Sequence, residues 1–244
     1  MSPSPALPQP VQTALDQFCT QLQDASGEDL VSILLYGDLV EGESFSDSSQ
    51  VNVMVVLQEI SVTSLDRLAG PIATAVDAIP LVPFVLSEAD LTQSTDVFPI
   101  KFLNIQRHHH LLYGRDVFDG LEIARDHLRL RCEQEIKNLM LRLRLFYLGR
   151  SQNPEGIQNT LSQTLSPFTK NLGILVELKT GAKTPPGTDE IFHTAASLGI
   201  NIEPLKQIQN LKQSNGAPRP EELKTLYNGF MKTVREAAGV VDSM

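Results

Sequence analysis

Two apolar runs, residues 30–36 and 53–57, are separated by a polar segment whose side chains could bind a ligand. Its four carboxylates are Asp38, Glu41, Glu43 and Asp47, and they are followed by two amides, Gln50 and Asn52. Carboxylates bind Mg²⁺ and Ca²⁺ strongly, whereas an amide offers only a neutral carbonyl oxygen. The four acids could gather around a cation, or they could be the solvated side chains of a turn. The second interpretation is favoured, because no wider ligand motif accompanies the acids.

Short helices and strands must position this polar segment. Residues 9–24 carry apolar side chains at helical spacing, which predicts an amphipathic helix. The runs LVSILLYG and VNVMVVL predict buried strands, and PLVPFVL predicts a third strand, at an edge or a bulge because of Pro83. Residues 64–79 are typical of a helix, and Ser87 is typical of a helix N-cap. Gln50 and Asn52 should open the second strand on one face, since residues i and i+2 coincide in a strand.

Residues 36–57 resemble the signature of the nucleotidyltransferase superfamily, to which kanamycin nucleotidyltransferase and polymerase β belong. In that superfamily a strand ends in Gly-Ser, and an acidic-glycine turn leads to a strand that carries Asp-x-Asp. The matching features are Gly37, the pair Gly42-Glu43, Asp47 and the apolar run at 53–57. The segments FPIKFLNIQRHHHLLYGRDVF and LYNGFMKTVREAAGVVDSM resemble bacterial proteins that join this domain to a helical bundle. The resemblance therefore covers nearly the whole chain.

The chain departs from this signature at the positions that would carry the chemistry. Gly-Ser is Gly37-Asp38 here, an arginine of many relatives is Glu41, and the two metal-binding aspartates fall on Gln50 and Asn52. A third carboxylate would be expected in PLVPFVL, which contains no acid. The resemblance implies nucleotidyl transfer with two divalent ions, so these changes predict no catalytic residues, no metal site and no cofactor. Mg²⁺ is expected only if its ligands have moved to the four acids of the polar segment.

The C-terminal half has sustained helical periodicity, which begins near residue 122. Apolar residues recur from Cys132 to Phe146, and further helices are predicted over residues 156–180, 190–199 and 220–241. Four helices with short connections predict an antiparallel four-helix bundle. The predicted fold class is α+β: residues 1–120 form a nucleotidyltransferase-like α/β domain, with a mixed sheet and helices on one face, and residues 121–244 form the bundle.

Charge is distributed unevenly along the chain, whose net charge is −9. Residues 1–100 hold one basic residue against fourteen acids, a net −13, whereas residues 101–150 have a net charge of +4. The arginines of the predicted first bundle helix could receive phosphate, or they could dock on the acidic segment of the same chain or of a second copy. Docking is favoured, because six acids are interleaved with the basic residues. These arginines are Arg125, Arg129, Arg142 and Arg144.

The composition argues against some classes of partner and leaves others open. Nucleic-acid binding is not expected, since it usually requires a one-sided basic patch. No apolar run reaches the ~18 residues that cross a bilayer, so no membrane partner is expected and a cytoplasmic location is predicted. The remaining partners are an unknown protein, a nucleotide-like small molecule, or a second copy in a homodimer. The ligand-binding candidates of the cleft are Gly37, Asp38, Glu43, Asp47, Arg125 and Arg129.

Histidines and cysteines add little to this assignment. The triplet at residues 108–110 could contribute metal ligands, but no Cys, Asp or Glu lies between residues 100 and 116, so a polar surface segment is favoured. Cys19 and Cys132 lie on apolar helical faces, which predicts buried thiols. Three hypotheses remain: a catalytically inactive binding or regulatory module, an active metal-dependent transferase that uses relocated carboxylates, and a protein-interaction subunit.

Overall fold

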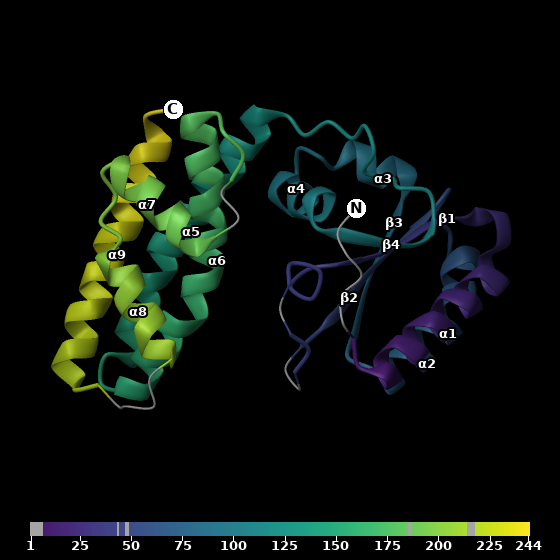
Figure 1. Cartoon of the computed structure of the whole chain (residues 1–244), viewed down its shortest axis with the longest axis horizontal. Coiled ribbons are helices and arrows are strands. Elements are labelled where there is room, and N and C mark those ends of the chain that lie inside the picture. Colours follow the sequence, from purple (N-terminus) through teal and green to yellow (C-terminus); the bar gives the residue numbers. More distant parts are fainter. Residues whose placement is uncertain (1–6, 43, 47–48, 185–186, 214–217) are drawn as a thin grey trace. The chain divides into compact units, whose positions relative to one another are not determined.

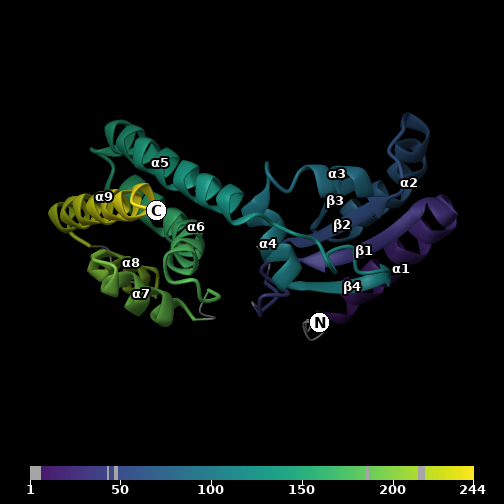
Figure 2. The same cartoon turned by 90° about the horizontal axis from the view of Figure 1, so that it is seen from above.

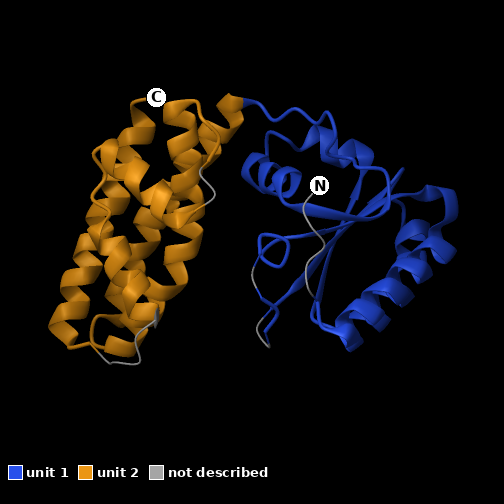
Figure 3. Ribbon diagram, in the orientation of Figure 1, with its two compact units in different colours: residues 1–124 blue, residues 125–244 orange. Residues whose placement is uncertain are grey.

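The structure is a computed structural model that describes residues 7–42, 44–46, 49–184, 187–213 and 218–244. Its chain divides into two compact units, residues 1–124 and 125–244 (Figure 3). None of the helices in the described ranges has the length and apolar character that crossing a bilayer requires.

Unit 1 is built around one mixed sheet of four strands in the order β3-β2-β1-β4. The central strands β1 (Leu30–Tyr36) and β2 (Val51–Leu57) are antiparallel. β3 (Leu81–Ser87) is parallel to β2 and forms one edge, and β4 (His109–Gly114) is antiparallel to β1 and forms the other. Pro83 lies in the edge strand, where its missing N–H costs no hydrogen bond inside the sheet. The prediction of an edge position for PLVPFVL is therefore confirmed.

Helices cover both faces of this sheet. Alternate strand residues face opposite sides, so Ile33 belongs to a core cluster with Phe18 of α1, and Leu34 belongs to a second cluster with Phe102 of α4. The first face is covered by α1 (Gln9–Ser26) and α2 (Val62–Ala78), which lie side by side (Figure 1). The second face is covered by α3 (Glu88–Gln93), α4 (Pro99–Arg107) and residues near Phe118. The expectation of helices on one face was wrong, because both sets of alternating strand residues are apolar and both must be buried.

Local sequence signals explain how several of these elements begin. A short 3-10 helix, η1 (Gly27–Asp29), leads from α1 into β1. Ser61 caps α2 by accepting a hydrogen bond from the Ser64 amide at 3.1 Å. Ser87 caps α3 in the same way, because its hydroxyl accepts from the Asp90 amide at 3.0 Å and its own amide donates to the Asp90 carboxylate at 3.0 Å. The predicted N-cap at Ser87 is confirmed.

Unit 2 is a helical region in which three long helices pack against one another. They are α5 (Arg125–Arg150), α6 (Pro154–Thr180) and α9 (Pro220–Asp242) (Figures 1 and 2). Two shorter helices, α7 (Thr188–Ser197) and α8 (Glu203–Gln213), pack on α6. The predicted α+β class, with a mixed sheet followed by a helical region, is confirmed. Helix α8 was not predicted from the sequence, so the described part of this region contains one helix more than the four expected.

Aromatic residues fill the centre of unit 2. The rings of Phe168 and Phe230 meet edge to face, with centroids 5.6 Å apart, and both side chains are fully buried. The Tyr227 hydroxyl donates to the Leu143 carbonyl oxygen at 2.7 Å and so links α9 to α5 inside the core. Burial raises the pKa of this hydroxyl to about 12. These contacts join α9 to both α5 and α6 in the interior of unit 2.

Candidate functional site

The turn after β1 and the start of β2 are packed against each other. Gly37 has φ +90, and its carbonyl oxygen accepts hydrogen bonds from the amides of Val40 at 2.9 Å and Glu41 at 3.0 Å. A Cβ atom at Gly37 would lie 3.0 Å from Nδ2 of Asn52. Both the positive φ and this close approach therefore favour glycine at position 37. The Asn52 amide lies directly against the turn.

Four residues form one row across this end of the sheet. Tyr36 is paired in register with His109 on one side and with Asn52 on the other, and Asn52 is paired with Val82. Residues paired in register project from the same face of a sheet. We call His109, Tyr36, Asn52 and Val82 the strand-end row. It lies on the face that α4 covers, because Tyr36 packs with the cluster of Phe102.

The acids of the polar segment lie outside this row. Asp38 and Glu41 are exposed, and Glu43 and Asp47 fall outside the described residues. Gln50 is exposed and immediately precedes β2. Within the described ranges, no three His, Cys, Asp or Glu side chains come together in a way that could hold a metal ion. A cation site built from all four acids stays a prediction.

A lysine that was not among the residues selected from the sequence lies over Phe84, beside the strand-end row. Lys101 is in the first turn of α4, and its ammonium nitrogen is 3.5 Å from the Phe84 ring centroid and 5.8 Å from the Tyr36 ring centroid. Burial lowers the pKa of this ammonium and raises the pKa of the Tyr36 hydroxyl. One signal was available: Lys101 is the first lysine of the chain and follows the acidic residues 1–100.

His109 is a buried structural residue. Its Nδ1 lies 2.8 Å from the Ile105 carbonyl oxygen and its Nε2 lies 3.1 Å from the Asp116 carboxylate. The other Asp116 oxygen accepts from the Phe118 amide at 2.9 Å, which fixes the carboxylate. The interpretation of residues 108–110 as a polar surface segment was therefore wrong for His109. His108 alone of the three is exposed.

The arginines predicted to bind a ligand have partners inside unit 2. Arg125 donates to the Leu178 carbonyl oxygen, which connects α5 to α6. Arg129 forms an ion pair with Glu133 at 3.2 Å, one turn further along α5. Arg142 and Arg144 are exposed. The proposed contact of these arginines with acids of residues 1–100 stays a prediction.

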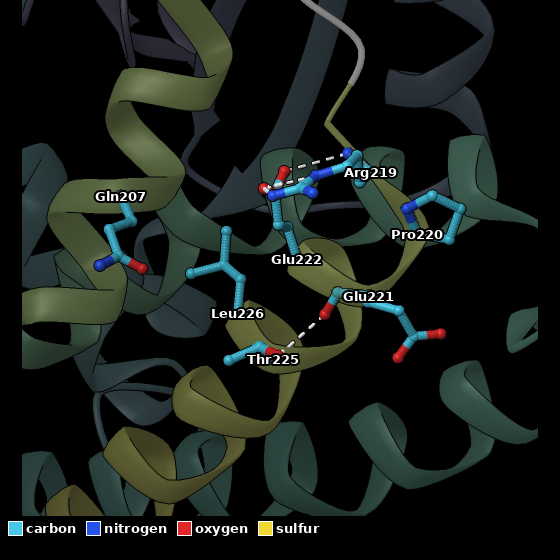
Figure 4. A pocket seen from close by; sticks show the side chains of 7 residues that line it. All are labelled: Gln207, Arg219, Pro220, Glu221, Glu222, Thr225 and Leu226. Atoms are coloured by element: carbon cyan, nitrogen blue, oxygen red, sulfur yellow. Dashed lines mark hydrogen bonds and ion pairs between the residues drawn. The ribbon is translucent and has the colours of Figure 1, made fainter.

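A hollow of about 680 Å³ lies between α8 and α9 (Figure 4). Arg219 is its only basic side chain, and Glu222 already holds the Arg219 guanidinium at 2.9 Å. The Glu222 carboxylate also accepts from the Arg219 amide at 3.1 Å, so the pair completes the N-terminal cap of α9. The two charged side chains Arg219 and Glu222 therefore line the hollow as parts of a helix cap. The remaining lining residues are Gln207, Pro220, Glu221, Thr225 and Leu226.

The whole chain resembles a solved nucleotidyltransferase structure. Spectinomycin adenyltransferase AAD(9) from Enterococcus faecialis, determined with ATP and spectinomycin, superposes with a TM-score of 0.54 at 12% identity. The match covers 92% of this chain and 99% of that protein. This chain has the nucleotidyltransferase fold. At this identity the likeness establishes the fold, together with its C-terminal helical region, and leaves the activity open.

Other comparisons add no further argument. A mutant form of the toxin–antitoxin pair MntA–HpeT matches with a TM-score of 0.35 at 15% identity, over 51% of this chain and 98% of that one. No protein-family model matches the chain, and no curated protein matches it. The nucleotidyltransferase fold predicted from residues 36–57 is nevertheless confirmed by the first match.

Proposed function

We propose that this nucleotidyltransferase-fold protein does not transfer nucleotides and acts as a binding or regulatory module. The observation that carries the proposal is the Asn52 amide, which lies against the Gly37 turn. The family resemblance implies a metal-binding aspartate at position 52. The scaffold is retained at this point of the sheet, while the group that would bind the metal has lost its charge.

The side chains of the strand-end row do not fit a pair of divalent ions. Mg²⁺ takes hard anionic oxygens and usually one or two carboxylates in a near-octahedral shell. The row offers an imidazole already held by Asp116, a phenol, an amide and Val82. The neighbouring strand β3 contains no acidic residue. Without such ions the leaving pyrophosphate would not be stabilised, which supports the absence of transfer.

The competing hypothesis is an active transferase whose carboxylates have moved into the polar segment. It requires Mg²⁺ bound by Asp38, Glu41, Glu43 and Asp47. Its prediction differs from ours in one respect that can be measured, because it makes the wild-type protein a Mg²⁺-dependent enzyme.

Pyrophosphate release separates the two hypotheses. The wild type and the variant Gln50→Asp/Asn52→Asp are each incubated with Mg²⁺ and each nucleoside triphosphate, with spectinomycin or the chain itself as acceptor. We expect no release from the wild type and Mg²⁺-dependent release from the double variant. The control Gln9→Asp/Gln17→Asp adds the same two charges on exposed positions of α1. Release by the wild type at the rate of the double variant would contradict the proposal.

A second candidate function is that of an interaction subunit, and an exposed apolar face of α5 favours it. Leu130, Leu141, Leu145 and Leu148 are 49%, 50%, 68% and 76% exposed. At 100° per residue they share one side of the helix, opposite the buried Cys132 and Leu139. We propose that this face pairs with a second copy of the chain, whose residues 1–100 supply the acidic complement of the basic residues 101–150.

Light scattering at low and high salt tests the homodimer. We expect a dimer at low salt that weakens at high salt, because exposed charges more than ~8 Å apart are screened at physiological ionic strength. The variant Leu145→Ser/Leu148→Ser should be monomeric, whereas the control Val62→Ser/Val76→Ser alters exposed apolar residues of α2 only. A monomeric wild type at both salt concentrations would remove this candidate.

A further inference from the structure

The position of Lys101 over the sheet follows from its two aromatic contacts. Tyr36 belongs to β1 and Phe84 to β3, and these strands flank β2. Strands separated by one neighbour lie about 9.6 Å apart, at about 4.8 Å for each step. An ammonium 3.5 Å from the Phe84 ring centroid and 5.8 Å from the Tyr36 ring centroid contacts side chains of both strands that flank β2, and it is nearer to the one on β3. It is on the face of β2 that carries Asn52 and Met54.

Lys101 has no counter-ion within the described part of the chain. Its contacts there are the two ring faces, and burial is the only cause found for the lowered pKa of its ammonium. Ring faces attract a cation, but they accept none of its N–H groups as a carboxylate would. Of the other cations of this unit, Arg115 pairs with Glu88 and Arg107 also has a partner, whereas the exposed Arg67 forms no ion pair among the described residues.

We infer that Lys101 and Asn52 form a metal-independent binding site for the phosphate groups of a polyphosphate ligand. This inference rests on the proposed function and names its ligand class. The Lys101 ammonium supplies a positive charge and donors on the face of the sheet that carries Tyr36 and Asn52. The Asn52 amide adds neutral N–H donors at the same end of the strand.

The charge of the surrounding segment explains why one lysine matters for the binding of a polyphosphate. Residues 1–100 carry a net charge of −13, so a polyphosphate approaching this unit meets mainly repulsion. A lysine binds phosphate as a point charge with three donors, and partial loss of water strengthens that contact. The contact of the ammonium with the Phe84 ring is a structural role of the same lysine, and Lys101→Met would lose it as well, so the stability of this variant must be measured beside its binding.

Binding of inorganic triphosphate in EDTA tests the inference by calorimetry. We expect the wild type to bind, Lys101→Met to bind about tenfold or more weakly, and Lys101→Arg to retain most of the affinity, because a charge-assisted contact is lost only in the methionine variant. The matched control is Arg67→Met, which removes the same charge from an exposed position of α2 on the other face of the sheet. Equal weakening by Lys101→Met and Arg67→Met would overturn the site.

Two further measurements keep the result unambiguous. Far-ultraviolet circular dichroism and the melting temperature show whether Lys101→Met is folded, and retention of binding by a folded Lys101→Met overturns the inference. ATP in EDTA forms a second arm: affinity equal to that of triphosphate indicates recognition of phosphates alone, and tighter binding indicates an added contact with the nucleoside. Both outcomes support the site, whereas failure of both ligands to bind the wild type overturns it.

Failure of this inference is distinguishable from failure of the proposed function. A wild type that releases pyrophosphate with Mg²⁺ contradicts the proposed function, whatever the affinity of Lys101→Met. A wild type that neither releases pyrophosphate nor binds triphosphate in EDTA contradicts only the phosphate site.

Discussion

The arginines of α5 in unit 2 and Lys101 in unit 1 differ in the groups that surround their charges. In unit 2 two arginines of α5 have partners one turn away, in the pairs Arg129–Glu133 at 3.2 Å and Arg131–Glu135 at 2.6 Å. In unit 1 the ammonium of Lys101 lies over two aromatic rings without a carboxylate among the described residues. The basic segment that stands out in the sequence thus uses much of its charge internally. Lys101, which begins that segment but belongs to unit 1, is the cation that we propose as the ligand-binding one.

Two polar side chains, one in each unit, show the same contrast. The hydroxyl of Tyr227 in unit 2 donates to the Leu143 carbonyl oxygen inside a packed core, so its hydrogen-bond donor is used within the fold. In unit 1 the Asn52 amide lies at the strand end beside a glycine turn with φ +90. Glycine adopts a positive φ without strain, so this turn lets the backbone approach Asn52 closely. We propose unit 1 as the binding unit because Tyr36, Asn52 and the ammonium of Lys101 lie on the same face of its sheet.

The largest expected effect tests the claim that unit 2 is chiefly a packed scaffold. Phe230→Ala removes a fully buried ring from the contact with Phe168, and we expect a loss of about 3–5 kcal/mol in the free energy of unfolding. Urea denaturation measures this loss. A loss below ~1 kcal/mol would mean that the interior of unit 2 is not tightly packed.

Thiol labelling can assign the loss to one unit. Burial raises the pKa of Cys19 in unit 1 and of Cys132 in unit 2 to about 12, so both thiols remain protonated at pH 8.5 in the folded chain. Unfolding returns each thiol to an ordinary pKa, at which iodoacetamide reacts readily. Phe230→Ala should accelerate labelling of Cys132 more than that of Cys19. Rapid labelling of both thiols in the wild type would contradict their burial.

An intermediate effect is expected at the glycine turn of unit 1. Gly37→Ala introduces a side chain at φ +90 and places its Cβ 3.0 Å from Asn52 Nδ2, so we expect a loss of about 1–3 kcal/mol. Gly42→Ala is the matched control, because its φ is +105 and nothing lies within 4 Å of the added Cβ. The difference between the two variants isolates the contact with Asn52. Equal losses would show that Asn52 does not press on the turn.

The smallest effect is expected from a paired cation on α5. Arg131→Met breaks an exposed ion pair with Glu135, which should change the free energy of unfolding by no more than about 0.5 kcal/mol. It should also leave triphosphate binding unchanged, in contrast to Lys101→Met. Weaker triphosphate binding by Arg131→Met would contradict the distinction between cations that have an ion-pair partner and cations that have none.

The sequence predicted elements whose signals are local. Short apolar runs and β-branched residues predicted β1 and β2, and Ser87 and Pro83 predicted a helix cap and an edge strand. The fold itself was predicted from a glycine turn between two strands. These features depend on residues that are close in the chain, and they survived the loss of the carboxylates.

The missed features depend on residues that are distant in the chain. β4 begins in a histidine run, and α4 has only nine residues, so neither shows a clear period. Lys101 was missed because it contacts Tyr36 and Phe84, which are brought together only by the order of the strands. Charge counts favoured Arg125 and Arg129 because a count does not record which charges are already paired.

The Mg²⁺ dependence of ATP binding to the wild-type chain tests the central claim most directly. The claim is that the strand end binds phosphate through Lys101 and Asn52 and has no metal ligands. Calorimetric titrations with ATP, in EDTA and in excess Mg²⁺, should give dissociation constants that differ by less than about threefold, or less than ~0.7 kcal/mol. Binding that appears only with Mg²⁺, or that tightens about tenfold or more when Mg²⁺ is added, would contradict the account.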